Sequence, residues 1–193
     1  MRIVGGRLRG RLLAAPASQA IRPTADRLRE SLFNILVHAY GDPITDARVL
    51  DLFAGTGALG LEALSRGAAF ALFIDEGAEA RALLRENVAT LGLGGTTRIF
   101  RRDATKLGAA HPIEPFSVAF LDPPYGRGLA EQALASARTG GWLAPGALVV
   151  VEEAAKPGFT SPEGFDEIER RNYDDSVLTV LRHRACALTF SPR

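Results

Sequence analysis

Hydrophobic positions along the chain fall into short continuous apolar runs and longer stretches in which apolar residues recur every three or four positions. The short runs predict buried strands, and the periodic stretches predict helices. Strands are expected at residues 48–53, 69–74, 97–101, 116–121, 146–152, 167–173 and 177–184. Helices are expected at residues 24–40, 58–66, 78–91 and 129–138.

This alternation of strands and helices indicates a mostly parallel sheet with helices on both faces. Only a few residues separate the last two predicted strands, which favours an antiparallel hairpin at the end of the sheet. Before the first helix, alternation from Gly6 to Leu13 is compatible with a short hairpin or an extended arm. We expect residues 1–40 to form an N-terminal arm plus helix, and residues 41–193 to form one α/β domain. Ligands of such open sheets bind beyond the carboxyl ends of the strands, near the point where the strand order reverses.

Composition narrows the class of protein. The chain has 193 residues, 47% of them hydrophobic, which suits one domain with a sizeable core. No run approaches the roughly 18 consecutive apolar residues that span a bilayer, and the start lacks the apolar stretch of a signal peptide. The single cysteine excludes an internal disulfide. These features favour a cytoplasmic protein with no membrane partner, and we expect a monomer.

Charge is distributed unevenly along the chain although the net charge is only +1. Residues 1–40 hold seven arginines against two acidic residues, whereas the rest holds 16 lysines and arginines against 20 acidic residues. A basic segment on a mildly acidic body fits an arm that binds nucleic-acid phosphates. It also fits a solvated N-terminal stretch, and charge alone does not separate the two interpretations.

The first predicted strand runs into a glycine-rich loop that reads Asp51-Leu-Phe-Ala-Gly-Thr-Gly-Ala-Leu-Gly60. Glycines let the backbone take up positive φ and approach a ligand closely, and the helix behind them offers free N–H groups. Three of these glycines also satisfy G-x-G-x-x-G, the dinucleotide fingerprint, so a nicotinamide cofactor has to be considered. The loop therefore predicts a cofactor site.

Acidic residues at the strand ends favour a cationic cofactor. Asp51 would repel a pyrophosphate but suits the positive sulfonium and amino group of S-adenosylmethionine. Asp75, at the end of the second strand, can accept both hydroxyls of a ribose, which either cofactor carries. Asp103, after the third strand, can take the amino protons of adenine while the N–H of Ala104 faces a ring nitrogen. Each acid could instead be an ordinary turn, capping or surface residue.

The fourth predicted strand ends in Asp122-Pro123-Pro124-Tyr125, the most specific motif in the chain. Two prolines make the segment stiff and extended. The Asp122 carboxylate and the Pro123 carbonyl can accept both protons of a base's exocyclic amine, which turns its lone pair towards an incoming methyl group. Tyr125 offers a stacking face to a base taken out of its helix. The alternative to this catalytic role is an ordinary proline-rich loop with a tyrosine in the core. No Ser-His-Asp set or metal-ligand cluster is evident, and we expect no metal.

Several segments resemble the bacterial small-subunit ribosomal RNA guanine-N2 methyltransferases of the RsmD type. The resemblance covers most of residues 2–152 and weakens after that. The segments that carry it are Arg2–Gly6, Arg9–Arg11, Arg22–Thr24, Asp26-Arg27, Arg29-Glu30, Leu32–Asn34, Asp51–Arg66, Asp122–Tyr125 and Gly141–Leu143.

This resemblance implies a Rossmann-like class I methyltransferase fold: a seven-stranded, mostly parallel sheet with an antiparallel last strand. It implies S-adenosyl-L-methionine as cofactor and one guanine of 16S ribosomal RNA as substrate, within a partly or fully assembled 30S subunit. Together with the strand-end positions, it assigns the base to Asp122, Pro123, Pro124 and Tyr125. It assigns the cofactor to Asp51, Phe53, Ala54, Gly55, Thr56, Gly57, Gly60, Asp75, Glu76, Asp103 and Ala104. It assigns substrate RNA to Arg7, Arg9, Arg11, Arg22, Thr24 and Arg27. Family members often have Glu where this chain has Asp75, and both are carboxylates.

Three alternatives stay open at this point. The same chemistry could act on another amino base, such as adenine N6 or cytosine N4 in RNA or DNA. The glycine pattern allows an NAD-dependent oxidoreductase. A non-catalytic RNA-binding protein on the same scaffold is disfavoured, because binding alone needs no amine clamp at Asp122–Tyr125.

Overall fold

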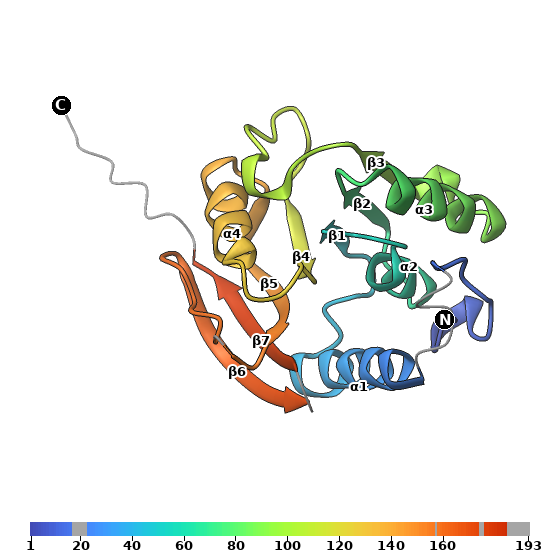
Figure 1. Cartoon of the computed structure of the whole chain (residues 1–193), viewed down its shortest axis with the longest axis horizontal. Helices are drawn as coiled ribbons and strands as arrows, with labels where there is room; N and C mark the ends of the chain where they lie inside the picture. The colour runs from blue at the N-terminus through green and yellow to red at the C-terminus, as the bar shows by residue number, and fades with distance from the viewer. Residues whose placement is uncertain (17–22, 157, 174–175, 185–193) are drawn as a thin grey trace.

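One sheet of seven strands forms the centre of the molecule (Figure 1). This computed structural model describes residues 1–16, 23–156, 158–173 and 176–184. The strands are β1 (Arg48–Leu52), β2 (Phe70–Ile74), β3 (Thr97–Phe100), β4 (Phe116–Leu121), β5 (Leu143–Ala154), β6 (Phe165–Tyr173) and β7 (Ser176–His183). Their order across the sheet is β3-β2-β1-β4-β5-β7-β6.

Strands β1 to β5 run parallel, and β7 runs antiparallel to both of its neighbours, β5 and β6. The expected sheet, with its antiparallel hairpin at the end of the chain, is thus confirmed. Strands β1, β2 and β4 are buried along almost their whole length, as expected of parallel strands covered on both faces.

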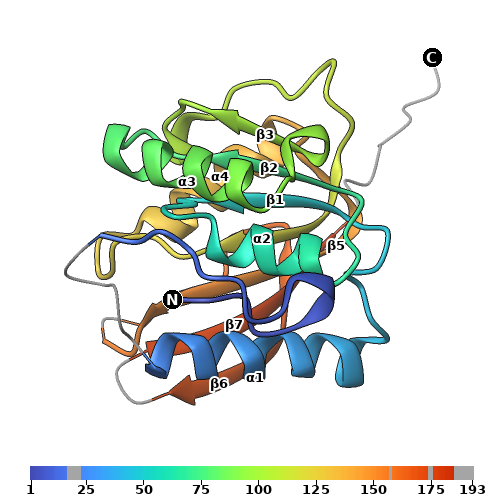
Figure 2. The same ribbon diagram turned by 90° about the vertical axis from the view of Figure 1, so that its right-hand side faces the viewer.

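Helices cover both faces of the sheet, as predicted. Helices α1 (Pro23–Tyr40), α2 (Ala58–Ser65) and α3 (Ala78–Thr90) lie on one face, which Figure 2 shows in front. Their apolar side chains share a core with alternate strand residues such as Val49, Phe73 and Phe120. Helix α4 (Leu129–Thr139) packs on the other face, where Trp142 and Leu134 join the intervening strand residues.

The N-terminal segment is more closely integrated than an arm. A short 3-10 helix, η1 (Gly6–Leu8), and a single β-bridge between Arg2 and Leu12 fold it back on itself. Ile3 and Leu13 are buried in the same core cluster as α1 and α2. Backbone groups of the segment donate to α2, from Val4 N–H to Glu62 (2.8 Å) and from Leu8 N–H to the Ser65 hydroxyl (3.0 Å). Residues 1–16 and 23–40 therefore share one core with the sheet and α2, and their contact with RNA stays a prediction.

The strand order reverses between β1 and β4, because the chain moves outward from β1 to β2 and β3 and then returns to the other side of β1. The loops that follow β1 and β4 leave the sheet next to each other at this point, where open α/β sheets bind ligands. The glycine loop and the Asp122–Tyr125 segment are those two loops.

Candidate functional site

A cleft of about 1320 Å³ opens at the carboxyl ends of the central strands. Helix α1 and the ends of β6 and β7 supply its other wall. Ten of the predicted site residues line it: Arg27, Phe53, Asp75, Glu76, Asp103, Ala104, Asp122, Pro123, Pro124 and Tyr125. The structure thus brings three of the expected cofactor acids, Asp75, Glu76 and Asp103, and the expected base-binding motif into one cavity.

The loop after β1 is built from residues in left-handed conformations. Phe53 has φ 60°, which is uncommon for a residue other than glycine, and its side chain lines the cleft. Gly55 and Gly57 follow at φ 56° and 80°. A Cβ on Gly57 would lie 2.3 Å from Leu84 Cδ1, and one on Gly60 would lie 2.4 Å from the Phe73 ring. Gly57 and Gly60 are therefore required by packing of the loop and α2 against the core.

Asp51 differs from the expectation that it faces the cofactor directly. Its side chain is 2% exposed, is not among the residues that line the cleft, and accepts the Gly60 N–H at 2.9 Å. Burial, followed by the charges of Asp122 and Asp75, raises its pKa well above the ordinary value. Asp51 thus holds the start of α2 against the end of β1.

Asp75 holds the glycine loop and faces the cleft at the same time. One carboxylate oxygen accepts the Gly55 N–H at 2.8 Å and the other accepts the Gly77 N–H at 2.7 Å. A carboxylate has about four acceptor sites, so both oxygens can still bind a hydroxyl. Glu76 lines the cleft beside it.

Asp103 caps a short 3-10 helix, η4 (Ala104–Lys106), and also lines the cleft. Its Oδ1 accepts the Thr105 N–H at 2.8 Å and the Thr105 hydroxyl at 2.7 Å, and these bonds lower its pKa. The turn role and the ligand role of this acid are compatible, because the capped carboxylate still reaches the cavity.

In the Asp122–Tyr125 segment, Asp122, Pro124 and Tyr125 are exposed, whereas Pro123 is buried. Tyr125 is 42% exposed, and its hydroxyl donates to Glu152 Oε1 at 2.7 Å. Glu153 accepts the Gly126 N–H at 2.8 Å, so two neighbouring acids of β5 fix the side chain and the backbone of this loop. The tyrosine is therefore no core residue, and its ring is held at the mouth of the cleft.

Asp122 is accessible within the cleft but surrounded by its walls. This desolvation, followed by the charges of Glu152 and Glu153, raises the pKa of Asp122 to about 7. Burial and the hydrogen bond to Glu152 raise the pKa of Tyr125. Three acidic side chains, Asp122, Glu152 and Glu153, are thus concentrated where β4 and β5 end.

This chemistry fits S-adenosylmethionine better than a dinucleotide. Five acids line the cleft, namely Asp75, Glu76, Asp103, Asp122 and Glu152, alongside four arginines, Arg27, Arg29, Arg102 and Arg127. The acids favour a ligand with a positive sulfonium and amino group, and Asp75, which is bonded to the glycine loop, disfavours a pyrophosphate there. Phe53 and Ala104 add apolar surface to the same cleft.

The predicted RNA-contacting residues separate into two locations. Arg27 lines the cleft and is exposed. Arg7, Arg9 and Arg11 are exposed but lie beside the C-terminal ends of α2 and α3, where the Arg11 guanidinium donates to the Thr90 carbonyl at 3.0 Å. Arg22 and the Thr24 side chain lie outside the described part of the structure.

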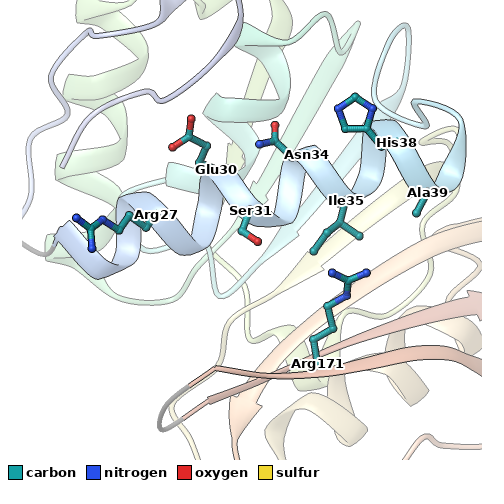
Figure 3. Close-up of a pocket in the computed structure, with 8 residues that line it drawn as sticks. All are labelled: Arg27, Glu30, Ser31, Asn34, Ile35, His38, Ala39 and Arg171. Carbon is teal, nitrogen blue, oxygen red and sulfur yellow. The ribbon is translucent and has the colours of Figure 1, made fainter.

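A second cavity, of about 590 Å³, adjoins the cleft along the outer side of α1 (Figure 3). Arg27 and Ser31 line both cavities, and Arg171 of β6 faces α1 across the groove. The cleft therefore continues past Arg27 into a groove between α1 and β6.

Sequence patterns did not identify the wall of the cleft opposite the glycine loop. Leu28 and Ser31 of α1, together with Tyr173 and Leu178 of the last hairpin, line it, and the Ser31 and Tyr173 hydroxyls lie 3.1 Å apart. Their sequence separation of 142 residues leaves no local signal. Glu152 was missed too, although its place at the carboxyl end of a central strand is a usable signal.

Two features are absent from the described residues. No group of three or more His, Cys, Asp or Glu side chains there could hold a metal ion. No helix in that part of the chain is both long enough and apolar enough to cross a membrane.

The known proteins to which this chain is similar include several methyltransferases. The family model described as "Conserved hypothetical protein 95" matches residues 1–182. Ribosomal RNA small subunit methyltransferase D of Escherichia coli K12 is 44% identical over 184 residues, covering 95% of this chain and 90% of that protein. The protein of the same name from Haemophilus influenzae is 35% identical over 173 residues, covering 89% and 88% of the two chains. The solved structure of yhhF from Escherichia coli superposes with a TM-score of 0.81 at 38% identity, covering 96% and 99%.

Proposed function

Because the chain belongs to the family of ribosomal RNA small subunit methyltransferase D, we propose that it transfers a methyl group from S-adenosylmethionine to the N2 amine of one guanine in 16S ribosomal RNA. The family and the fold support the reaction class and the ribosomal substrate. The choice of guanine N2 and the assembled 30S subunit as the form acted upon are the finer parts of the proposal. The same proposal assigns the protein to the cytoplasm, where ribosomal subunits are assembled.

One observation carries the proposal: the Asp122–Tyr125 segment and the acids of the cofactor loops line the same cleft. The Asp122 carboxylate and the Pro123 carbonyl accept hydrogen bonds from the two N–H groups of the target amine. They orient its lone pair and stabilise the positive charge that develops on nitrogen. Tyr125, held at the mouth by Glu152, stacks on the base.

S-adenosylmethionine, when bound, supplies the electrophilic methyl group. We assign its ribose to Asp75 and Glu76 and its adenine to Asp103, Ala104 and Phe53, all of which line the cleft. Gly55 and Gly57 shape the loop beside it, while Asp51 and Gly60 support that loop from within the core. Binding of a cationic cofactor by these residues explains why so many acids face the cavity.

We further propose that RNA enters along α1. Arg27 stands where the cleft meets the outer groove, so it can bind a phosphate next to the target nucleotide. Arg7, Arg9 and Arg11 lie away from the cleft and would bind a different part of a folded RNA.

A transfer assay tests the function. Purified protein is expected to move labelled methyl groups from S-adenosylmethionine onto small ribosomal subunits from cells that lack this enzyme. Asp122→Ala should abolish transfer while cofactor binding, measured by calorimetric titration, persists. Asp166→Ala, which removes an exposed carboxylate on β6, is the control and should transfer normally. Normal transfer by Asp122→Ala would refute the role of Asp122.

Nucleoside analysis of the labelled product separates guanine from other amino bases. The proposal requires N2-methylguanosine. Recovery of N6-methyladenosine or N4-methylcytidine would keep the chemistry and change the substrate.

A further inference from the structure

Two carboxylates stand next to each other at the carboxyl ends of β4 and β5. Leu121, the last residue of β4, pairs with Val151 of β5 in parallel register, so Asp122, directly after β4, and Glu152 of β5 follow at matching positions. Side chains at matching positions of neighbouring strands project to the same face of a sheet. Both side chains line the cleft, and Glu152 is the first of the charges that raise the pKa of Asp122.

Only one of the two carboxylate oxygens of Glu152 has a hydrogen-bond partner among the described residues. Its Oε1 accepts the Tyr125 hydroxyl at 2.7 Å. Within the described residues no hydrogen bond reaches its Oε2, and the side chain is only partly buried. Glu152 therefore keeps one free acceptor in the cleft that Asp122 also lines.

The carboxylates of Asp122 and Glu152 match the hydrogen-bond donors on the Watson–Crick edge of guanine. Guanine carries two kinds of donor side by side, the N2 amine and the N1–H. Adenine and cytosine carry an amine beside a ring nitrogen with a lone pair. A flipped base is read by hydrogen bonds to this edge. Two adjacent carboxylates repel each other, so a donor-only edge relieves the repulsion and a lone pair adds to it.

We propose that Glu152 selects guanine by accepting its N1–H, while Asp122 and the Pro123 carbonyl hold the N2 amine. This rests on the proposed methyltransferase function and names the specificity-determining residue of that site. Glu152 then has two tasks, because the same side chain also holds the Tyr125 hydroxyl against which the base stacks.

Two nucleotides separate selection from mere support of the loop. Guanosine 5′-monophosphate and the 5′-monophosphate of 2-aminopurine riboside share the 2-amino group, but only the first has an N1–H. Each is used as a competitive inhibitor of methyl transfer to small subunits. A hydrogen bond to a charged group accounts for about a tenfold or larger difference between their inhibition constants in the unmodified protein.

Three variants complete the test. Glu152→Gln removes the charged acceptor and should bring the two inhibition constants to near equality. Tyr125→Phe removes the tyrosine hydroxyl and leaves Glu152 in place, so the preference for the guanine nucleotide should persist although transfer slows. Glu153→Gln removes a neighbouring charge that bonds the backbone of Gly126, and it should also keep the preference.

The outcomes are distinguishable. Loss of the preference in Glu152→Gln alone supports the assignment. An unchanged ratio in Glu152→Gln, an equal loss in Tyr125→Phe, or no preference or no inhibition in the unmodified protein overturns it. Label recovered in adenine or cytosine also overturns it while leaving the methyltransferase function intact, whereas absence of any transfer to small subunits refutes the proposed function itself.

Discussion

At the scale of single residues, the cleft brings carboxylate side chains together although their negative charges repel each other. Asp122 lies beside Glu152 and Glu153, and its pKa is raised to about 7 from the ordinary value of 3.8. At this residue the folded protein therefore binds more protons than the unfolded chain between about pH 4 and pH 7. Linkage then requires the contribution of Asp122 to stability to fall as the pH rises through this window.

Asp122→Asn should remove this penalty. Because the amide is neutral at every pH, the variant should melt at a higher temperature than the unmodified protein at pH 8. The gain should shrink at pH 5, where Asp122 is already largely protonated in the folded state. Thermal melts at the two pH values measure it, with Asp166→Asn as the exposed control. An equal gain at both pH values would mean that the charge of Asp122 does not destabilise the fold.

The glycine loop illustrates what a residue-level motif leaves undetermined. Gly57 and Gly10 share left-handed conformations, at φ 80° and 85°. A Cβ on Gly57 would meet Leu84 and Phe73, whereas nothing lies within 4 Å of one on Gly10. Gly57→Ala adds overpacking of about 1–3 kcal/mol to the cost of a left-handed alanine.

We therefore expect Gly57→Ala to lose more unfolding free energy than Gly10→Ala in urea denaturation. Cofactor affinity, from calorimetric titration, should fall in Gly57→Ala only, because that substitution displaces the loop beside the cleft. Similar losses in both variants would show that the backbone conformation, and not the contact with Leu84, dominates.

At the scale of secondary-structure elements, the hydrophobic pattern predicted each described strand and α-helix of the sheet and its covering layers. Differences arose where a boundary depends on tertiary contacts. Strand β5 was predicted to begin at Gly146 but begins at Leu143, so it includes Pro145, a residue that is unusual inside a strand. The N-terminal segment could not be placed, because its partners Glu62 and Asn87 lie 58 and 73 residues away in the sequence.

Glu62 is the centre of that unpredicted contact. Its side chain is fully buried, its Oε2 accepts the Val4 N–H at 2.8 Å, and its Oε1 accepts the Arg66 Nε–H at 2.8 Å. The Arg29 Nε of α1 lies 3.5 Å from the same carboxylate. One acid of α2 thus joins α1, α2 and the N-terminal segment.

Glu62→Gln should cost about 3–5 kcal/mol of unfolding free energy, because it removes the buried charge that pairs with Arg66 and with buried Arg29, of which only Arg29 keeps a second acidic partner, Asp26. Limited proteolysis should cleave the N-terminal segment earlier than in the unmodified protein. Glu167→Gln breaks an exposed ion pair with Arg170 and should cost less than about 1 kcal/mol. A decrease of the same small size in Glu62→Gln would show that the N-terminal segment is held by its apolar residues instead.

At the scale of the whole molecule, strand order turns scattered motifs into one site. The acids after β2, β3 and β4 could be predicted because parallel strands end at one edge of the sheet, whereas Asp51 of β1 turned out to be buried beside the site. The wall formed by α1 and the β6–β7 hairpin could not be, since hydrophobic periodicity does not say which helix covers which strand ends. The same limit applies to the basic segment with Arg7, Arg9 and Arg11. The sequence shows its charge but does not predict how far from the cleft it lies.

That distance allows RNA binding at the two places to be measured separately. Arg27 stands at the cleft, whereas Arg7, Arg9 and Arg11 lie by the C-terminal ends of α2 and α3, away from the strand ends that bear the site. A short single-stranded RNA that fills the cleft should meet Arg27 only, and a whole small subunit should meet both places. Removing one arginine that binds a phosphate flattens the log–log salt dependence of RNA affinity by roughly one unit.

Replacing Arg7, Arg9 and Arg11 with alanine should therefore flatten the salt dependence for small subunits and leave that for the short RNA unchanged. Arg27→Ala should flatten both, because its phosphate lies next to the target base. Arg138→Ala, on the helix that covers the other face of the sheet, is the control and should change neither. If the triple variant flattens the dependence for the short RNA as well, the N-terminal segment must reach the cleft when RNA binds. If it flattens neither, its arginines are ordinary solvated charges, and the subunit has to be bound through the groove along α1.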